Sequence, residues 1–125
     1  MPSLQPYDAL AQQAADRDDI NAARDRMEIA PIQIGDYLVD CDPKSETRMD
    51  NALKVFATIA AKGTLDWTMA DNQVVPLTRA GLETIYNDML TARALRSAQL
   101  HARATEIKGR LPGVTMRDIE PENWG

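Results

Sequence analysis

The sequence predicts an α+β fold in which two short β-hairpins pack with three helices, the third of them long, followed by an extended C-terminal arm. Three observations predict it: three segments with apolar residues at helical spacing, two segments of strand-forming residues around turn residues, and a final aperiodic stretch. A chain of 125 residues has the size of one domain. We divide it into an N-terminal segment with the start of the first helix (residues 1–19), an α+β domain (20–108) and an extended tail (109–125).

The composition is that of a soluble globular protein, with 44% hydrophobic and 26% charged residues and a net charge of −5. No stretch approaches the roughly 18 apolar residues that a membrane span needs. The acidic balance disfavours nucleic acid or an anionic membrane as partner, because neutralising phosphates takes a clustered positive surface. Cys41 is the single cysteine, so no intrachain disulfide forms, and the N-terminus has no secretion signal. We therefore expect synthesis in a reducing cytoplasm.

The first helix is predicted over Tyr7–Glu28, which contains no Gly or Pro and has apolar residues near the spacing of one face. Pro31 ends it. Ala30–Asp42 is predicted to be the first hairpin, because strand-forming residues flank the turn residues Gly35 and Asp36.

A second helix has two possible starts, either Asp42 as N-cap with Pro43 in the first helical position, or Ser45 as N-cap one turn later. In both cases it is expected to run to about Ala61, before Gly63. Its apolar face is predicted to be the centre of the core, since each large buried side chain contributes roughly 1.5 to 3 kcal/mol. This face consists of Met49, Ala52, Leu53, Phe56, Ile59 and Ala60.

The second hairpin is predicted from residues 65–69, a turn at 70–73 and a returning strand at 74–77. Pro76 cannot donate a ladder hydrogen bond, so this strand lies at an edge or ends there. Thr78 is a good N-cap for a third helix over Arg79–Lys108. At 1.5 Å per residue that helix is about 45 Å long, so it projects beyond a compact body or breaks.

The two Ala-rich helical segments differ in charge. Tyr7–Glu28 has six acidic side chains against three basic ones, whereas Arg93–Arg110 has five basic side chains against Glu106. These biases complement each other if the helices pack together, within one chain or between chains, and they set orientation more than stability. We predict partner contacts through Arg93, Arg96, Arg103 and, in the aperiodic tail, Trp124.

No catalytic residue, cofactor site or metal site is predicted. Four acidic residues lie close in sequence, Asp36, Asp40, Asp42 and Asp50, but a calcium loop needs a glycine and further ligands where Pro43 and Lys44 stand. Turn and cap roles are the simpler interpretation of these residues.

Cys41 and His101 are the residues that a thiol nucleophile and its base would need, although nothing in the sequence links them. A small buried cysteine and a solvated histidine are the simpler interpretation. A nucleic-acid stripe along the arginines of the third helix is disfavoured, because no aromatic residue interleaves it.

Four segments of the chain carry a family resemblance when they are taken together. They are Val39-Asp40-Cys41-Asp42-Pro43-Lys44-Ser45, Arg48-Met49-x-x-Ala52-Leu53, Trp67-Thr68-Met69-Ala70-Asp71-Asn72 and Val75-Pro76-Leu77-Thr78. In this combination the chain resembles a small domain family of bacteriophages and prophages, a domain of unknown function found in tail-fibre and other tail-associated proteins. The resemblance covers about Ile20 to Ile107, and Cys41 and the tail after Lys108 depart from it.

The resemblance implies a phage tail setting without enzymatic activity. We therefore expect a non-enzymatic structural or adaptor protein at the baseplate or tail-fibre attachment of the virion tail, made in the bacterial cytoplasm. Its expected partners are other tail, baseplate or fibre proteins and further copies of itself. The alternative is a tail-fibre assembly chaperone that is absent from the mature virion.

Overall fold

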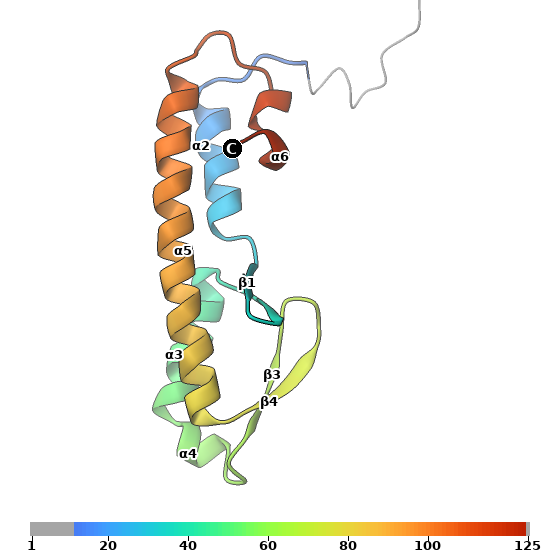
Figure 1. Cartoon of the computed structure of the whole chain (residues 1–125), viewed down its shortest axis with the longest axis vertical. Helices are drawn as coiled ribbons and strands as arrows, with labels where there is room; N and C mark the ends of the chain where they lie inside the picture. Colours follow the sequence, from blue (N-terminus) through green and yellow to red (C-terminus); the bar gives the residue numbers. More distant parts are fainter. Residues whose placement is uncertain (1–11, 125) are drawn as a thin grey trace, which may run out of the picture. The chain divides into compact units, whose positions relative to one another are not determined.

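The computed structural model describes residues 12–124 and has the predicted α+β fold (Figure 1). The chain forms two compact units. The first, called the hairpin unit here, is Ile29–Arg96; the second, the helical unit, combines the chain up to Glu28 with the chain from Ser97 onward. This division is by compactness and does not coincide with the predicted segments 1–19, 20–108 and 109–125.

The hairpin unit begins with the first predicted hairpin. Strands β1 (Ile32–Ile34) and β2 (Tyr37–Val39) are antiparallel, and Ile32 lies opposite Val39. Gly35 turns the chain with a φ of +57°, a conformation that L side chains rarely adopt. The Gly-Asp turn therefore sets the register of this hairpin.

The second predicted helix forms as two pieces, α3 (Pro43–Lys54) and α4 (Phe56–Ile59). Asp42 is the extended N-cap and Pro43 lies in the first turn, which confirms the first of the two predicted starts. The prediction of one helix to about Ala61 is wrong, because Val55 leaves the helical conformation at φ −117° and ψ 18°. Val55 and two of the next four residues are β-branched, and such residues have lowered helix propensity.

The second hairpin consists of β3 (Leu65–Thr68) and β4 (Val74–Leu77), as predicted. Asn72 has φ +68° in the connecting turn. The register places two pairs on the inner face and two on the exposed outer face. The inner pairs are Leu65 with Leu77 and Trp67 with Val75, and the outer pairs are Asp66 with Pro76 and Thr68 with Val74.

Helix α5 (Arg79–Lys108) has the predicted bounds and is unbroken. Thr78 caps it, since the Gly81 N–H donates to Thr78 Oγ1 at 3.1 Å. Its residues to Arg96 belong to the hairpin unit, where α5 packs over the hairpins and α3. The buried core there is Val39, Cys41, Met49, Ala52, Phe56, Ala60, Met69, Val75, Leu77, Leu82, Ile85 and Met89.

In the helical unit, α2 (Arg17–Glu28) begins later than the predicted Tyr7. Asp16 and Asp19 cap its start reciprocally, each backbone N–H donating to the other carboxylate at 2.9 Å. Ahead of the cap the backbone is paired elsewhere: Ala14 forms a β-bridge with Thr115. The part of the prediction over residues 7–11 lies outside the described residues.

The C-terminal arm follows α5 as predicted, but it is folded and packed. A 3₁₀ turn (η1, Arg117–Ile119) and the short helix α6 (Pro121–Trp124) bring apolar side chains into the helical unit's core. The tail that was predicted to be extended thus contains helical turns, although its sequence has no periodic face. The buried core residues are Ala15, Ile20, Ala23, Leu100, Ala104, Ile107, Val114, Ile119 and Trp124. Within residues 12–124, no helix is long and apolar enough to cross a membrane.

Candidate functional site

Two arginines of α5 hold both ends of the first hairpin. Arg96 donates through Nη2 to the Ala30 carbonyl at 2.8 Å and to Cys41 Sγ at 3.1 Å. Arg93 donates to the Cys41 carbonyl at 2.8 Å and pairs with Glu46 at 3.0 Å. Ala30 precedes β1 and Cys41 follows β2, so we call these five residues the hairpin clamp.

The clamp changes the interpretation of Arg93 and Arg96. Both were predicted to contact a partner, but their described bonds lie inside their own unit. The acceptors are carbonyls that lie 52 and 66 residues away in sequence. Residue patterns on α5 alone therefore could not identify them.

Cys41 is a buried thiol, which confirms the simpler interpretation of this residue as a small buried cysteine. It donates to the Ala30 carbonyl at 3.0 Å. Cys41 belongs to the hairpin unit and His101 to the helical unit. The described contacts of Cys41 are those of a side chain that positions the hairpin ends.

His101 is about half exposed and is not simply solvated. Its Nε2 lies 2.6 Å from Oε1 of Glu28, and the Ser97 hydroxyl donates to the same oxygen at 3.3 Å. Ser97 and His101 are four residues apart and face α2 from one side of α5. Ser97 and His101 both contact the Glu28 carboxylate, so they link α5 to α2. These bonds do not pair His101 with the Ser97 hydroxyl, as a general base and its nucleophile would be paired.

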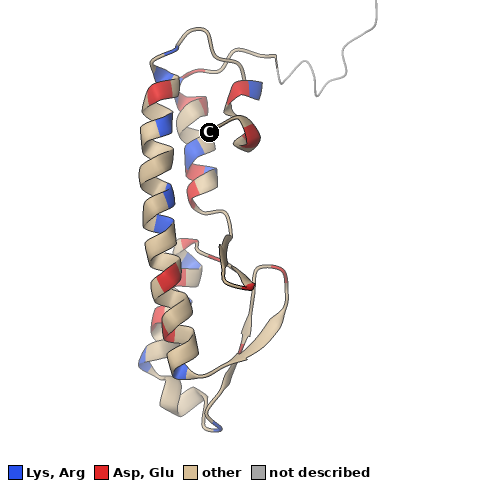
Figure 2. Cartoon of the chain, viewed as in Figure 1, with Lys and Arg blue, Asp and Glu red and all other residues tan. Residues whose placement is uncertain are grey.

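The acidic first helix does pack with the basic end of the third within one chain, one of the two possibilities left open (Figure 2). Polar contacts between them include those of Ser97 and His101 with Glu28. Arg103 on α5 and Arg110, just after its end, bind Glu106 of α5 at 2.7 and 3.1 Å.

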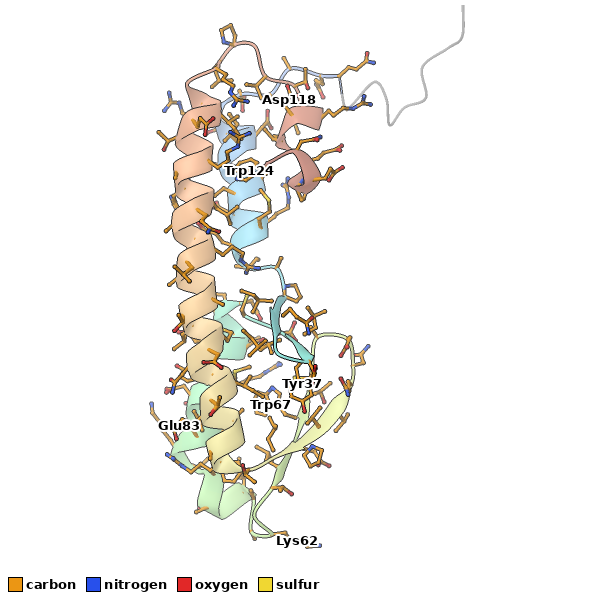
Figure 3. All side chains as sticks on the ribbon, in the orientation of Figure 1. Tyr37, Lys62, Trp67, Glu83, Asp118 and Trp124 are labelled. Atoms are coloured by element: carbon orange, nitrogen blue, oxygen red, sulfur yellow. The ribbon has the colours of Figure 1, made fainter. Side chains whose placement is uncertain are left out.

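Trp124, which is predicted from the sequence to contact a partner, lies in the core of the helical unit. Only 4% of its surface is exposed. Arg103, also predicted to bind a partner, donates through Nε to the Trp124 carbonyl. Figure 3 shows Trp124, the last residue of α6, on the side of that helix that faces α2. The two residues therefore secure the arm to α5.

Asp118 ties the arm locally. Its Oδ2 accepts the backbone N–H and the hydroxyl of Thr115, at 2.9 and 3.0 Å. These hydrogen bonds, the backbone one first, hold the pKa of Asp118 below its usual value. Figure 3 shows Asp118 in the 3₁₀ turn η1 of the arm.

We therefore expect the ionised Asp118 to stabilise the helical unit above about pH 4 and the protonated form to stabilise it less. A lowered pKa means that this contribution is lost as the pH falls through the folded-state pKa. Thermal midpoints of the protein and of Asp118→Asn, measured at pH 7 and pH 3, check this. The midpoints should differ at pH 7 and converge at pH 3. Asp16 also has a lowered pKa, but it is common to both proteins, so an equal gap at the two pH values would contradict the role of Asp118.

The predicted acidic grouping around the start of α3 is divided among structural roles. The pKa of Asp42 is lowered, chiefly by a hydrogen bond with the side chain of Ser45. Asp50 pairs with Lys54 at 2.8 Å. Among residues 12–124, no three His, Cys, Asp or Glu side chains are grouped so as to hold a metal ion.

Large apolar side chains remain on the surface of the hairpin unit. Val55 and Ile59, at the break between α3 and α4, are each 49% exposed, and Val74 on β4 is 57% exposed. Leu95 on α5 is 62% exposed. Sequence reasoning missed all four as surface features, and it placed Ile59 on the buried face of a continuous helix. Ile59 lies off that face in α4, whereas Phe56 and Ala60, which also follow the break at Val55, remain buried as predicted.

The described residues thus form an α+β protein whose polar clusters bind its own elements together and which also exposes several large apolar side chains. The chain belongs to the family described as Domain of unknown function (DUF4376), whose model matches residues 11–122. No curated protein and no solved structure matches the chain.

Proposed function

We propose that this chain is a non-enzymatic structural or adaptor protein of a bacteriophage tail, located at the baseplate or the tail-fibre attachment. It acts through protein–protein contacts with other tail proteins and with further copies of itself. The observation that carries the proposal is the exposure of Val55, Ile59, Val74 and Leu95 on one unit. Val55 and Ile59 lie one helical turn apart, and neighbouring exposed apolar side chains are typical of a surface that another protein covers.

The tail setting rests on the segments that resemble phage proteins. Both principal segments, residues 39–45 and 67–78, belong to the hairpin unit. Next to them, the Ala70 N–H donates to the Leu38 carbonyl at 2.8 Å and so links the second hairpin to the first. The resembling residues therefore form one connected substructure, as a shared domain requires.

The test is the protein content of virions from the source bacterium. Particles are induced, purified on a density gradient and digested for quantitative mass spectrometry. We expect the chain in purified particles at a fixed ratio to a tail protein. Presence in the lysate with absence from the particles would overturn the virion role and favour a fibre assembly chaperone. A source that releases no phage particles would overturn the tail setting.

A further inference from the structure

Two adjoining segments of the hairpin unit carry charges of opposite sign. Residues 51–64 contain no acidic side chain but include Lys54 and Lys62, in a chain whose net charge is −5. Residues 65–77 contain no basic side chain but include Asp66 and Asp71. Each segment exposes large apolar side chains beside its charges. A surface that is apolar and cationic thus lies on the same chain as one that is apolar and anionic.

The cationic surface is the tip formed by Val55, Ile59 and Lys62. Val55 and Ile59 are four residues apart, and the Ile59 N–H donates to the Val55 carbonyl at 3.2 Å, so their side chains lie one turn apart. Both are 49% exposed. None of the ion pairs among residues 12–124 involves Lys62, which Figure 3 shows in the loop after α4. The tip can therefore offer a free ammonium beside two apolar side chains.

The anionic surface is the outer face of the second hairpin, formed by Asp66, Thr68, Val74 and Pro76. The register pairs Asp66 with Pro76 and Thr68 with Val74, and all four residues are exposed. None of the ion pairs of the described chain involves Asp66. Asp71 adds a second carboxylate in the turn, where Figure 2 shows the acidic colour, at the other end of the hairpin from Lys62.

We propose that the tip of one copy docks on the outer face of the second hairpin of another copy. Val55 and Ile59 would cover Val74 and Pro76, while Lys62 would pair with Asp66. The partner is a second copy because one chain exposes both complementary surfaces. These are the apolar, cationic tip and the apolar, anionic outer face of the second hairpin. The charge pair sets the orientation, and the apolar contact supplies most of the affinity.

This contact joins two different surfaces, so after one contact the first copy keeps an unused hairpin face and the second copy keeps an unused tip. Such heterologous contacts close into rings or continue as open chains. The inference deepens the proposed function, on which it rests for its setting, by naming which surfaces the copies use.

The test measures association of the full chain by sedimentation velocity over a wide concentration range. We expect concentration-dependent self-association, weakened at least tenfold by Ile59→Glu and by Val74→Glu. Leu95→Glu is the matched control, since Leu95 is a comparably exposed apolar residue of the same unit outside both surfaces. It should leave association unchanged. Circular dichroism confirms that each variant is folded.

A charge exchange gives the decisive arm. Lys62→Glu makes the tip of one copy repel the hairpin face of another, and Asp66→Lys does the same with the opposite sign, so each variant alone should associate more weakly than the wild type. An equimolar mixture should recover association, because each variant's tip now meets an opposite charge on the other's hairpin face. A monomeric wild type, no recovery in the mixture, or loss of association on Leu95→Glu alone would overturn the proposal. A monomeric chain found in virions would overturn this inference alone, whereas an associating chain absent from virions would overturn the proposed function alone.

Discussion

Replacing Trp124 by Ala is expected to lower the free energy of unfolding of the helical unit by about 3 to 5 kcal/mol. Trp124 is 4% exposed and belongs to the same buried cluster as Ile20 and Leu100. Removing the indole leaves a cavity that the α2 and α5 side chains can fill only in part. Urea unfolding followed by circular dichroism, together with amide exchange in α2, measures the loss.

Trp124→Phe is the matched control for this substitution. It keeps much of the apolar volume and removes the indole Nε1, a buried group that has no hydrogen-bond partner in the described structure. An unsatisfied buried donor costs about 1 to 3 kcal/mol, so its removal offsets part of the lost volume. We expect Phe to cost less than half as much as Ala. If Trp124→Ala left stability unchanged and abolished self-association, Trp124 would be the partner anchor that the sequence had suggested.

Local chemistry explains which elements were predictable. Helix α5 begins after the Thr78 cap, and it ends before Gly109, a poor helix former. Each hairpin has a residue with positive φ in its turn, Gly35 in one and Asn72 in the other. At the ends of α5 and in the two turns, the conformational preference of a few neighbouring residues agrees with the structure.

The elements that were mispredicted depend on partners far away in sequence. Residues near Ala14 have helical composition, yet their backbone pairs with the arm: the Ala15 N–H donates to the Val114 carbonyl at 2.8 Å. The same pairing orders an arm whose own sequence has no periodic face. Asp16 and Asp19 did offer a local sign of the true helix start, as a reciprocal cap.

For the residues predicted to contact a partner, the structure shows contacts within the chain that the sequence did not predict. Arg93, Arg96 and Arg103 do make specific polar contacts, but with carbonyls and carboxylates of their own chain. Sequence periodicity gives the face of a helix on which a side chain lies. It does not say whether that face meets the same chain or another.

Replacing Arg96 by Met is expected to cost the hairpin unit about 2 to 3 kcal/mol, because hydrogen bonds from a charged donor contribute about 1.5 to 3 kcal/mol and Met retains the apolar stem. The substitution removes the donors to the Ala30 carbonyl and to Cys41 Sγ, one contact at each end of the first hairpin, while Arg93 still donates to the Cys41 carbonyl. Amide exchange in β1 and β2 should rise more than exchange in β3 and β4.

A double-mutant cycle with Cys41→Ala separates the clamp from general loss of packing. Cys41→Ala removes a small buried side chain and the thiol that Arg96 contacts. If Arg96 acts through the clamp, the double variant should lose less stability than the two single losses added together, with a coupling above about 0.5 kcal/mol. Arg96→Lys keeps the positive charge but not the planar guanidinium with its several donors. We therefore expect it to lose some stability relative to the wild type, but less than Arg96→Met loses. Additive losses, or a Lys variant as unstable as the Met variant, would show that Arg96 stabilises the unit by other contacts than these.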